Sequence, residues 1–203
     1  ALEKLTGEKT RVIAASRTDS GVHARGQVVS FRTTSSHSQQ TFVKGLNFHL
    51  PADIAVKTAY RMDDSFNVRR DAVSREYNYY ILNSAARSPL NDHFSYRVEG
   101  ELDVPEMNRA GEELIGEHDL ASFASDLGVP LKSTVRRVLR AGFSRDGEMI
   151  VFNIVASSFL PHQVRNTVGA MVRVGQAKLS LNEFYRIIEA KRIGLAGPTA
   201  PPK

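Results

Sequence analysis

The fold class is decided by two β-rich runs and the turn that joins them. Residues 134–143 read TVRRVLRAGF, residues 149–156 read MIVFNIVA, and Arg145-Asp146-Gly147-Glu148 lies between them. Asp-Gly between two extended runs is the strongest short-range signal for a β-hairpin, because both residues tolerate the positive φ that the turn requires. The chain is therefore predicted to contain antiparallel sheet.

Helices are predicted before and after this hairpin in the sequence. Asp103 with Glu106, and Ser180 with Glu183, have the spacing of capping boxes. In a capping box the side chain of each of the two residues accepts a hydrogen bond from the backbone N–H of the other, at the start of a helix. The first of these helices should run on to Gly116. The closing run from Gly197 to Lys203 is too rich in proline for a helix or a strand.

The N-terminal third is predicted as strand, loop and strand over residues 10–15 and 26–32, then a short helix around Phe42 to Leu46 and a strand over residues 54–60. Strands and helices do not alternate as regular βα units, so the predicted class is α+β, with mixed, largely antiparallel sheets flanked by helices. We expect two parts, an N-terminal α+β part at 1–83 and a C-terminal α+β part at 84–203.

Composition narrows the classes of function. The 203 residues include no Cys, which excludes disulfides, thiolate chemistry and Cys-based zinc sites. The six His residues lack metal-ligand spacing, and neither a membrane span nor a signal peptide is present, so we expect a cytoplasmic protein with no metal. Lys plus Arg exceed Asp plus Glu by 27 − 22 = 5. Arg dominates the cations, which favours a nucleic-acid partner, although a high-GC genome also enriches Arg.

The first candidate site is the loop SRTDSGVHARGQ at residues 16–27. Arg17 and Arg25 flank Asp19, and two nearby cations would keep this carboxylate ionised, as an anionic nucleophile or base requires. The simpler alternative is an Asp-Ser-Gly turn with surface arginines.

The second candidate site is the start of a helix predicted from Pro161 to Val174. One stripe of this helix is apolar, and His162, Arg165, Asn166 and Gly169 form another stripe, which on its own is typical of a solvated face. A third feature is the aromatic strand around Tyr77. Its side chains could stack on a base, but their spacing favours a core, because Tyr79 and Ile81 share the face of Tyr77.

Together these segments resemble the tRNA pseudouridine synthase A family, through five motifs in the family's order over nearly the whole chain. Arg17 to Val28 resembles its nucleophile motif, Arg75 to Tyr79 its Arg-x-Tyr-x-Tyr strand, Asp119 to Phe123 its Asp-x-x-Ser-Phe segment, Phe159 to Gly169 its helix start, and Ala196 to Pro201 its closing loop. The family also begins with a strand bearing Tyr-Asp-Gly and Gly-Trp-Gln, which is missing from this sequence, and the resemblance places a closing strand after Lys203.

The resemblance implies the pseudouridine synthase fold with a central catalytic cleft, and isomerisation of uridine in the anticodon stem-loop of tRNA, at positions 38–40, by a homodimer without cofactor. Asp19 would be the nucleophile, and Arg165 would hold its carboxylate. The substrate-binding residues would be Tyr77, stacking on the flipped uracil, Arg17, displacing the base, and Arg25 and His162. Flipping is required because a base inside a stem cannot present its ring to a side chain.

Two other functions stay open. A non-catalytic RNA-binding protein would use the same arginine-rich cleft and the stacking Tyr77 without isomerising anything. For the synthase too, RNA binding should be dominated by phosphate contacts, with Arg25, Arg69, Arg70 and Arg136 as candidates. A hydrolase using Ser158 and His162 is the weaker alternative, because the chain has no Gly-x-Ser-x-Gly elbow. Pairing of Asp19 with Arg165 in the fold would favour the synthase.

Overall fold

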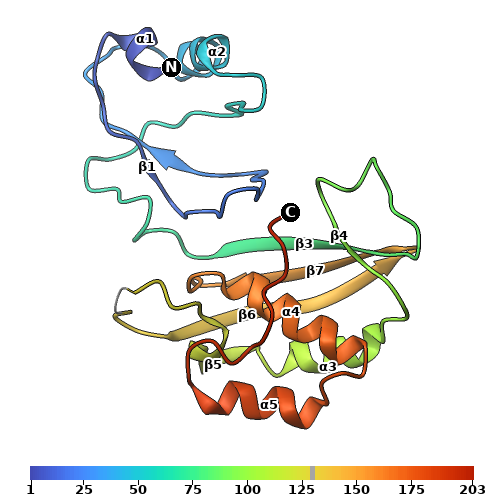
Figure 1. The fold of residues 1–203 in the computed structure, drawn as a ribbon. Helices are drawn as coiled ribbons and strands as arrows, with labels where there is room; N and C mark the ends of the chain where they lie inside the picture. Colours follow the sequence, from blue (N-terminus) through green and yellow to red (C-terminus); the bar gives the residue numbers. More distant parts are fainter. Residues whose placement is uncertain (129–130) are drawn as a thin grey trace. The chain divides into compact units, whose positions relative to one another are not determined.

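The computed structural model describes residues 1–128 and 131–203 (Figure 1). They form two compact units, one of residues Ala1–Arg17 and Ala24–Ala72, the other of Thr18–His23 and Val73–Lys203. Strand β3 (Arg75–Asn83), which the sequence prediction put in the N-terminal part, pairs with strands of the second unit. The division between residues 83 and 84 stays a sequence-based prediction.

The first unit pairs two short strands and packs two helices. It contains α1 (Leu2–Thr6), β1 (Ile13–Ala14), β2 (Val29–Ser30) and α2 (Gln39–His49). β1 and β2 are antiparallel, which confirms the predicted order of strand, loop and strand, but each strand has two residues and is shorter than predicted. Helix α2 begins at Ser38, whose side chain accepts from the Thr41 N–H, and it buries Phe42 and Leu46 one turn apart.

The strand predicted over residues 54–60 is wrong, because these residues are assigned to no strand. The Val56 N–H donates to Asn47 Oδ1 at 2.7 Å, and Asn47 Nδ2 donates to the Val56 carbonyl at 2.9 Å. A side chain of α2 thus satisfies the two backbone groups that a neighbouring strand would pair with.

The second unit is built on a five-stranded mixed sheet. Its order is β4 (Tyr96–Val98), β3, β7 (Met149–Ala156), β6 (Val135–Asp146) and β5 (Gly116–Asp119). β3 and β4 are parallel and every other pair is antiparallel. The hairpin closes where Asp146 lies opposite Met149, and Gly147 has φ +57°. The predicted hairpin and the α+β class with a largely antiparallel sheet are confirmed.

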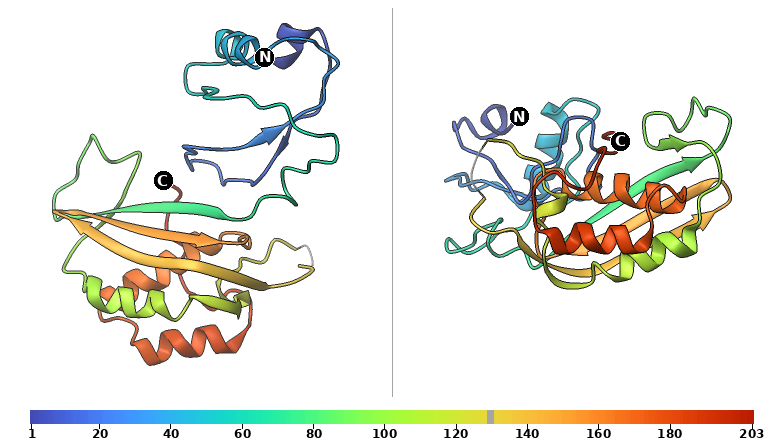
Figure 2. Two further views of the ribbon diagram at one scale, coloured as in Figure 1. Left: turned by 180° about the vertical axis from the view of Figure 1, so that it is seen from behind. Right: turned by 60° about the horizontal axis from the view of Figure 1, so that its bottom comes forward.

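Three helices lie on the same side of this sheet, as Figure 1 and the two views of Figure 2 show. They are α3 (Val104–Glu112), α4 (Gln163–Gly175) and α5 (Leu181–Ala190), and a 3-10 turn, η1, spans Ala121–Phe123. Ser180 with Glu183 forms a complete capping box on α5, as predicted. At α3 only half of the predicted box is present, because Asp103 accepts from the Glu106 N–H while the Glu106 carboxylate pairs with Arg109. α3 is shorter than predicted, because Gly116 at φ +118° already begins β5. None of the helices in the described ranges is long and apolar enough to cross a membrane.

The core lies between the sheet and these helices. β7 alternates strictly, and Ile150, Phe152 and Ile154 are fully buried on its helix-facing side. Phe143 of β6 stacks on Phe152 with ring centroids 4.6 Å apart. Burying such a side chain contributes about 1.5–3 kcal/mol relative to exposure. This core holds the start of α4 and the start of β3 in place, and both carry predicted site residues.

Candidate active site

Asp19 lies in a tight turn of the second unit. The Val22 N–H donates to the Asp19 carbonyl at 3.1 Å, and Gly21 has φ +87°, a conformation that glycine adopts without strain. The predicted Asp-Ser-Gly turn is therefore present. Its Asp19 side chain is 34% exposed, so its carboxylate is accessible to a ligand.

Arg165 pairs directly with Asp19. Its Nη1 lies 2.7 Å from Asp19 Oδ2, although the two residues are 146 positions apart in the sequence. The Arg165 side chain is 18% exposed, and its Nε donates to the Ala200 carbonyl at 2.8 Å. A guanidinium held at two points is oriented as well as charged, and charge-assisted bonds of this length are strong.

His162 is the third member of this group. Its Nε2 lies 3.6 Å from Asp19 Oδ1, within ion-pair range if the ring is protonated. The residue precedes α4 in the left-handed region, at φ 56°, which is uncommon outside glycine. Such strain persists where the surrounding structure over-determines it, as at sites where a side chain is held for a task. The Asp19 carboxylate is thus flanked by a guanidinium and an imidazole. Asp19, Arg165 and His162 are called the Asp19 group below.

The polar stripe of α4, which its pattern predicts as a solvated face, is covered by other parts of the second unit. Asn166 is 4% exposed, its Nδ2 donates to the Phe123 carbonyl at 2.8 Å, and its Oδ1 accepts from Thr199 Oγ1 at 2.6 Å. A Cβ added to Gly169 would lie 2.0 Å from the Pro198 carbonyl oxygen. The C-terminal residues therefore cover this stripe, while the core covers the apolar one.

Tyr77 is half-buried on β3 and packs edge-on against Phe159, with ring centroids 5.0 Å apart and planes at 84°. Phe159 lies three residues before His162, in the segment that leads into α4. Tyr77 therefore belongs to the same part of the second unit as the Asp19 group, and its stacking role stays a prediction.

Arg17 and Arg25 are described in the first unit, where both side chains are exposed. The Arg25 carbonyl accepts from Lys57 Nζ at 2.6 Å, and the Ser16 carbonyl beside Arg17 accepts from Gln27 Nε2 at 2.9 Å. The roles of the two arginines toward Asp19 and RNA stay predictions. In the second unit, the cation next to the Asp19 carboxylate is Arg165.

Tyr79 is a residue whose polar contact the sequence reasoning missed. Spacing assigned it to the core, and it is indeed 5% exposed. Its hydroxyl also donates to the Pro201 carbonyl at 2.6 Å, beside the Ala200 carbonyl that holds Arg165. The available signal was its place in the Arg-x-Tyr-x-Tyr motif, because a buried tyrosine usually has a partner for its hydroxyl.

This arrangement can present a reactive carboxylate to a ligand. Asp19 is accessible, and its counter-charge is fixed by α4 and the C-terminal residues, so the anion is oriented without a metal ion being invoked. Among residues 1–128 and 131–203, no three His, Asp or Glu side chains are grouped so as to hold a metal.

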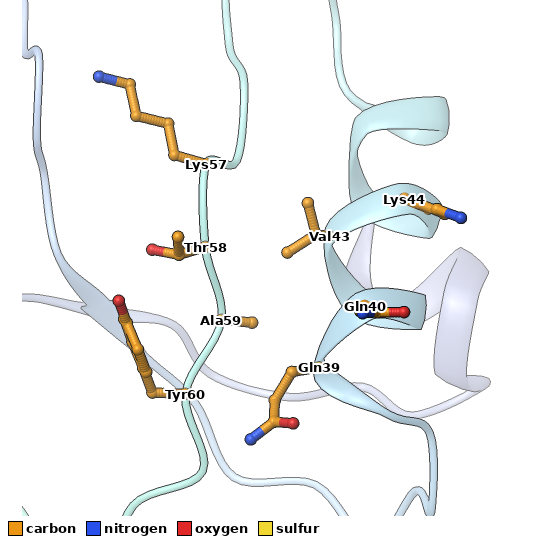
Figure 3. A pocket seen from close by; sticks show the side chains of 8 residues that line it. All are labelled: Gln39, Gln40, Val43, Lys44, Lys57, Thr58, Ala59 and Tyr60. Carbon is orange, nitrogen blue, oxygen red and sulfur yellow. The ribbon is translucent and has the colours of Figure 1, made fainter.

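A surface pocket of about 310 Å³ lies elsewhere, in the first unit between α2 and residues 57–60. Figure 3 shows Val43 and Ala59 pointing toward each other across it. None of the predicted site residues lines this pocket, so the candidate site is the Asp19 group and not the pocket.

Comparisons with known proteins confirm the resemblance given by the motifs. A family model described as tRNA pseudouridine synthase matches residues 1–71 and 110–203. The tRNA pseudouridine synthase A of Geobacter sulfurreducens is 41% identical over 203 residues, covering 100% of this chain and 83% of the relative. Those of Colwellia psychrerythraea (37%, covering 100% and 78%) and Acetivibrio thermocellus (39%, covering 99% and 82%) are similar too. This chain belongs to the tRNA pseudouridine synthase family.

Proposed function

We propose that this chain is a tRNA pseudouridine synthase in which Asp19 is the nucleophile. The observation that carries the proposal is the 2.7 Å pairing of Asp19 Oδ2 with Arg165 Nη1 in a member of this family. Relatives that match the full length of the chain bear the name tRNA pseudouridine synthase A. The same pairing argues against a purely RNA-binding role, for which a charge-oriented and accessible carboxylate has no use.

The reaction is an isomerisation, so every atom of the uridine is retained. The bond between N1 of uracil and C1′ of ribose breaks, a bond between C5 and C1′ forms, and in net terms a proton leaves C5 and one is gained at N1. Asp19 acts as the anionic nucleophile toward the base or the sugar, and no redox partner is needed. Arg165 keeps the carboxylate oriented before and after the covalent step.

The bound uridine must leave its stack to reach Asp19. We assign stacking on the flipped uracil to Tyr77, with His162 as a further contact and with Arg17 and Arg25 at the displaced base and its strand. Positions 38–40 of the anticodon stem-loop are the proposed targets, a homodimer the proposed assembly and the cytoplasm the proposed compartment, in line with the family resemblance.

Formation of pseudouridine in tRNA tests the proposal. The purified protein, incubated with unmodified tRNA transcripts, should convert uridine at one or more of positions 38–40, detected by pseudouridine-specific chemical labelling and primer extension. A transcript with cytidine at these positions is the control and should give no product. Binding of tRNA without any product would instead support the RNA-binding alternative.

Affinity for tRNA should fall steeply with salt, because phosphate contacts by arginines release counterions. Replacing Arg25 or Arg69 by Gln should each flatten the log–log slope by about 0.7–0.9. Arg70 should have less effect, because its Nε is already paired with Asp71 at 2.8 Å. Arg136 should have less effect, since its Nη1 donates to the Ser133 and Val135 carbonyls and burial lowers its pKa.

Filter binding between low and physiological salt measures these slopes. Arg109→Gln is the matched control, because Arg109 is exposed on α3 and already paired with Glu106 at 2.8 Å. Its slope should equal that of the unmodified protein. Affinity that is insensitive to salt would contradict an arginine-based RNA surface.

A further inference from the structure

The residues from Ala196 to Pro202, here called the closing segment, have few backbone donors. Pro198, Pro201 and Pro202 lack an N–H, so regular structure cannot form and the segment must be held largely through its carbonyls and side chains. Side chains of β3 and α4 supply donors, and the segment crosses the first turns of α4 (Figure 1).

Helix α4 holds the closing segment at three successive places. Pro198 lies over Gly169, where an added Cβ would meet its carbonyl oxygen at 2.0 Å. Thr199 Oγ1 donates to Asn166 at 2.6 Å. The Ala200 contact is reciprocal, because its N–H donates to the Arg165 carbonyl at 3.2 Å while its own carbonyl accepts from Arg165 Nε at 2.8 Å.

Strand β3 holds the next residue. Tyr79 Oη donates to the Pro201 carbonyl at 2.6 Å from a side chain that is 5% exposed. Burial raises the pKa of the Tyr79 hydroxyl, with the nearby Tyr96 as a smaller cause, so the group stays protonated and able to donate. Pro202 then lies against Gly21, two residues after Asp19.

We propose that Tyr79 is a positioning residue for the isomerisation, acting through the closing segment on Arg165. By fixing the Pro201 carbonyl, Tyr79 fixes the neighbouring Ala200 carbonyl, which holds the Nε end of the guanidinium. Nη1 of the same planar group is then aimed at Asp19. The inference rests on the proposed function, since it assumes that orientation of Asp19 limits the reaction.

The substitution Tyr79→Phe tests this, because it removes one oxygen and keeps the buried ring. We expect kcat for pseudouridine formation to fall about 10- to 100-fold, the range for a displaced catalytic group, with KM for tRNA within about twofold, since phosphate contacts provide the affinity. Tyr185→Phe is the matched control, because Tyr185 is a partly buried tyrosine of α5 that packs against the same core. Its kcat should be unchanged.

A second variant displaces the closing segment from the other side. Gly169→Ala places a methyl group where the Pro198 carbonyl lies, so it should lower kcat in the same manner while Tyr79 is intact. Gly142→Ala is its control, because a Cβ there would meet Asn108 Oδ1 at 3.5 Å, an ordinary contact. Loss in the first variant and not in the second would support the closing segment as the link.

Solvent exchange of the Arg165 Nε–H, followed by NMR, gives a readout that does not depend on activity. Exchange should speed up about five- to tenfold in Tyr79→Phe and stay unchanged in Tyr185→Phe, because the bond to Ala200 is weakened only in the first. Unchanged kcat or unchanged exchange in Tyr79→Phe would overturn the inference. An unmodified protein that makes no pseudouridine would overturn the proposed function instead, and the exchange measurement would still decide whether Tyr79 positions Arg165.

Discussion

The variant Asp19→Asn should lose pseudouridine formation by on the order of 10³-fold or more, because the amide is neither an anion nor a nucleophile. The substitution preserves the shape of the side chain and an oxygen that can accept from Arg165 Nη1, so the turn and the helix start should stay intact. Affinity for tRNA should change by no more than about threefold, since phosphate contacts supply most of it.

Single-turnover assays with excess enzyme measure the chemical step, and filter binding measures the affinity. Asp146→Asn is the matched control, because Asp146 is an exposed residue at the hairpin turn, where Asn is well tolerated. It should keep full activity. Appreciable turnover by Asp19→Asn would remove Asp19 as the nucleophile.

Elements with local signals could be predicted from the sequence. The hairpin follows from Asp146-Gly147, and the start of α5 follows from Ser180 and Glu183, because in each case the residues that stabilise the structure are neighbours in the chain. The strand predicted over residues 54–60 failed for the opposite reason. Apolar and polar residues do alternate in this stretch, but a strand also needs a neighbouring strand to pair with. Here the side chain of Asn47 is hydrogen-bonded to the N–H and the carbonyl of Val56 instead.

The candidate site was harder to predict, because its residues come from two separate segments. Taken alone, the Asp19 segment is explained as a turn, and the Arg165 segment as a polar stripe on a helix. Asp19 and Arg165 are brought into contact by packing between parts of the chain that lie 146 positions apart. The family resemblance predicted this contact, which the periodicity of the sequence could not. The hydroxyl of Tyr79 was missed because spacing reports which face a side chain occupies and says nothing of the acceptor at its tip.

Replacing Arg165 should have the second-largest effect on activity. Arg165→Met keeps the length of the side chain but removes both the bond to Asp19 and the bond to the Ala200 carbonyl, and we expect kcat to fall about 10²- to 10³-fold. Arg165→Lys retains the charge, yet one compact ammonium group cannot reproduce the fork that spans the two partners. Its activity should lie between that of the Met variant and the unmodified protein.

The matched control is Arg186→Met, which removes an exposed arginine of α5 and should leave kcat unchanged. The double variant Asp19→Asn with Arg165→Met decides whether the two residues act as one unit. If Arg165 works by orienting Asp19, it has nothing left to orient once the nucleophile is gone, so the double variant should be no less active than Asp19→Asn alone. A further loss of the full Arg165→Met factor would mean that Arg165 acts on the substrate independently of Asp19.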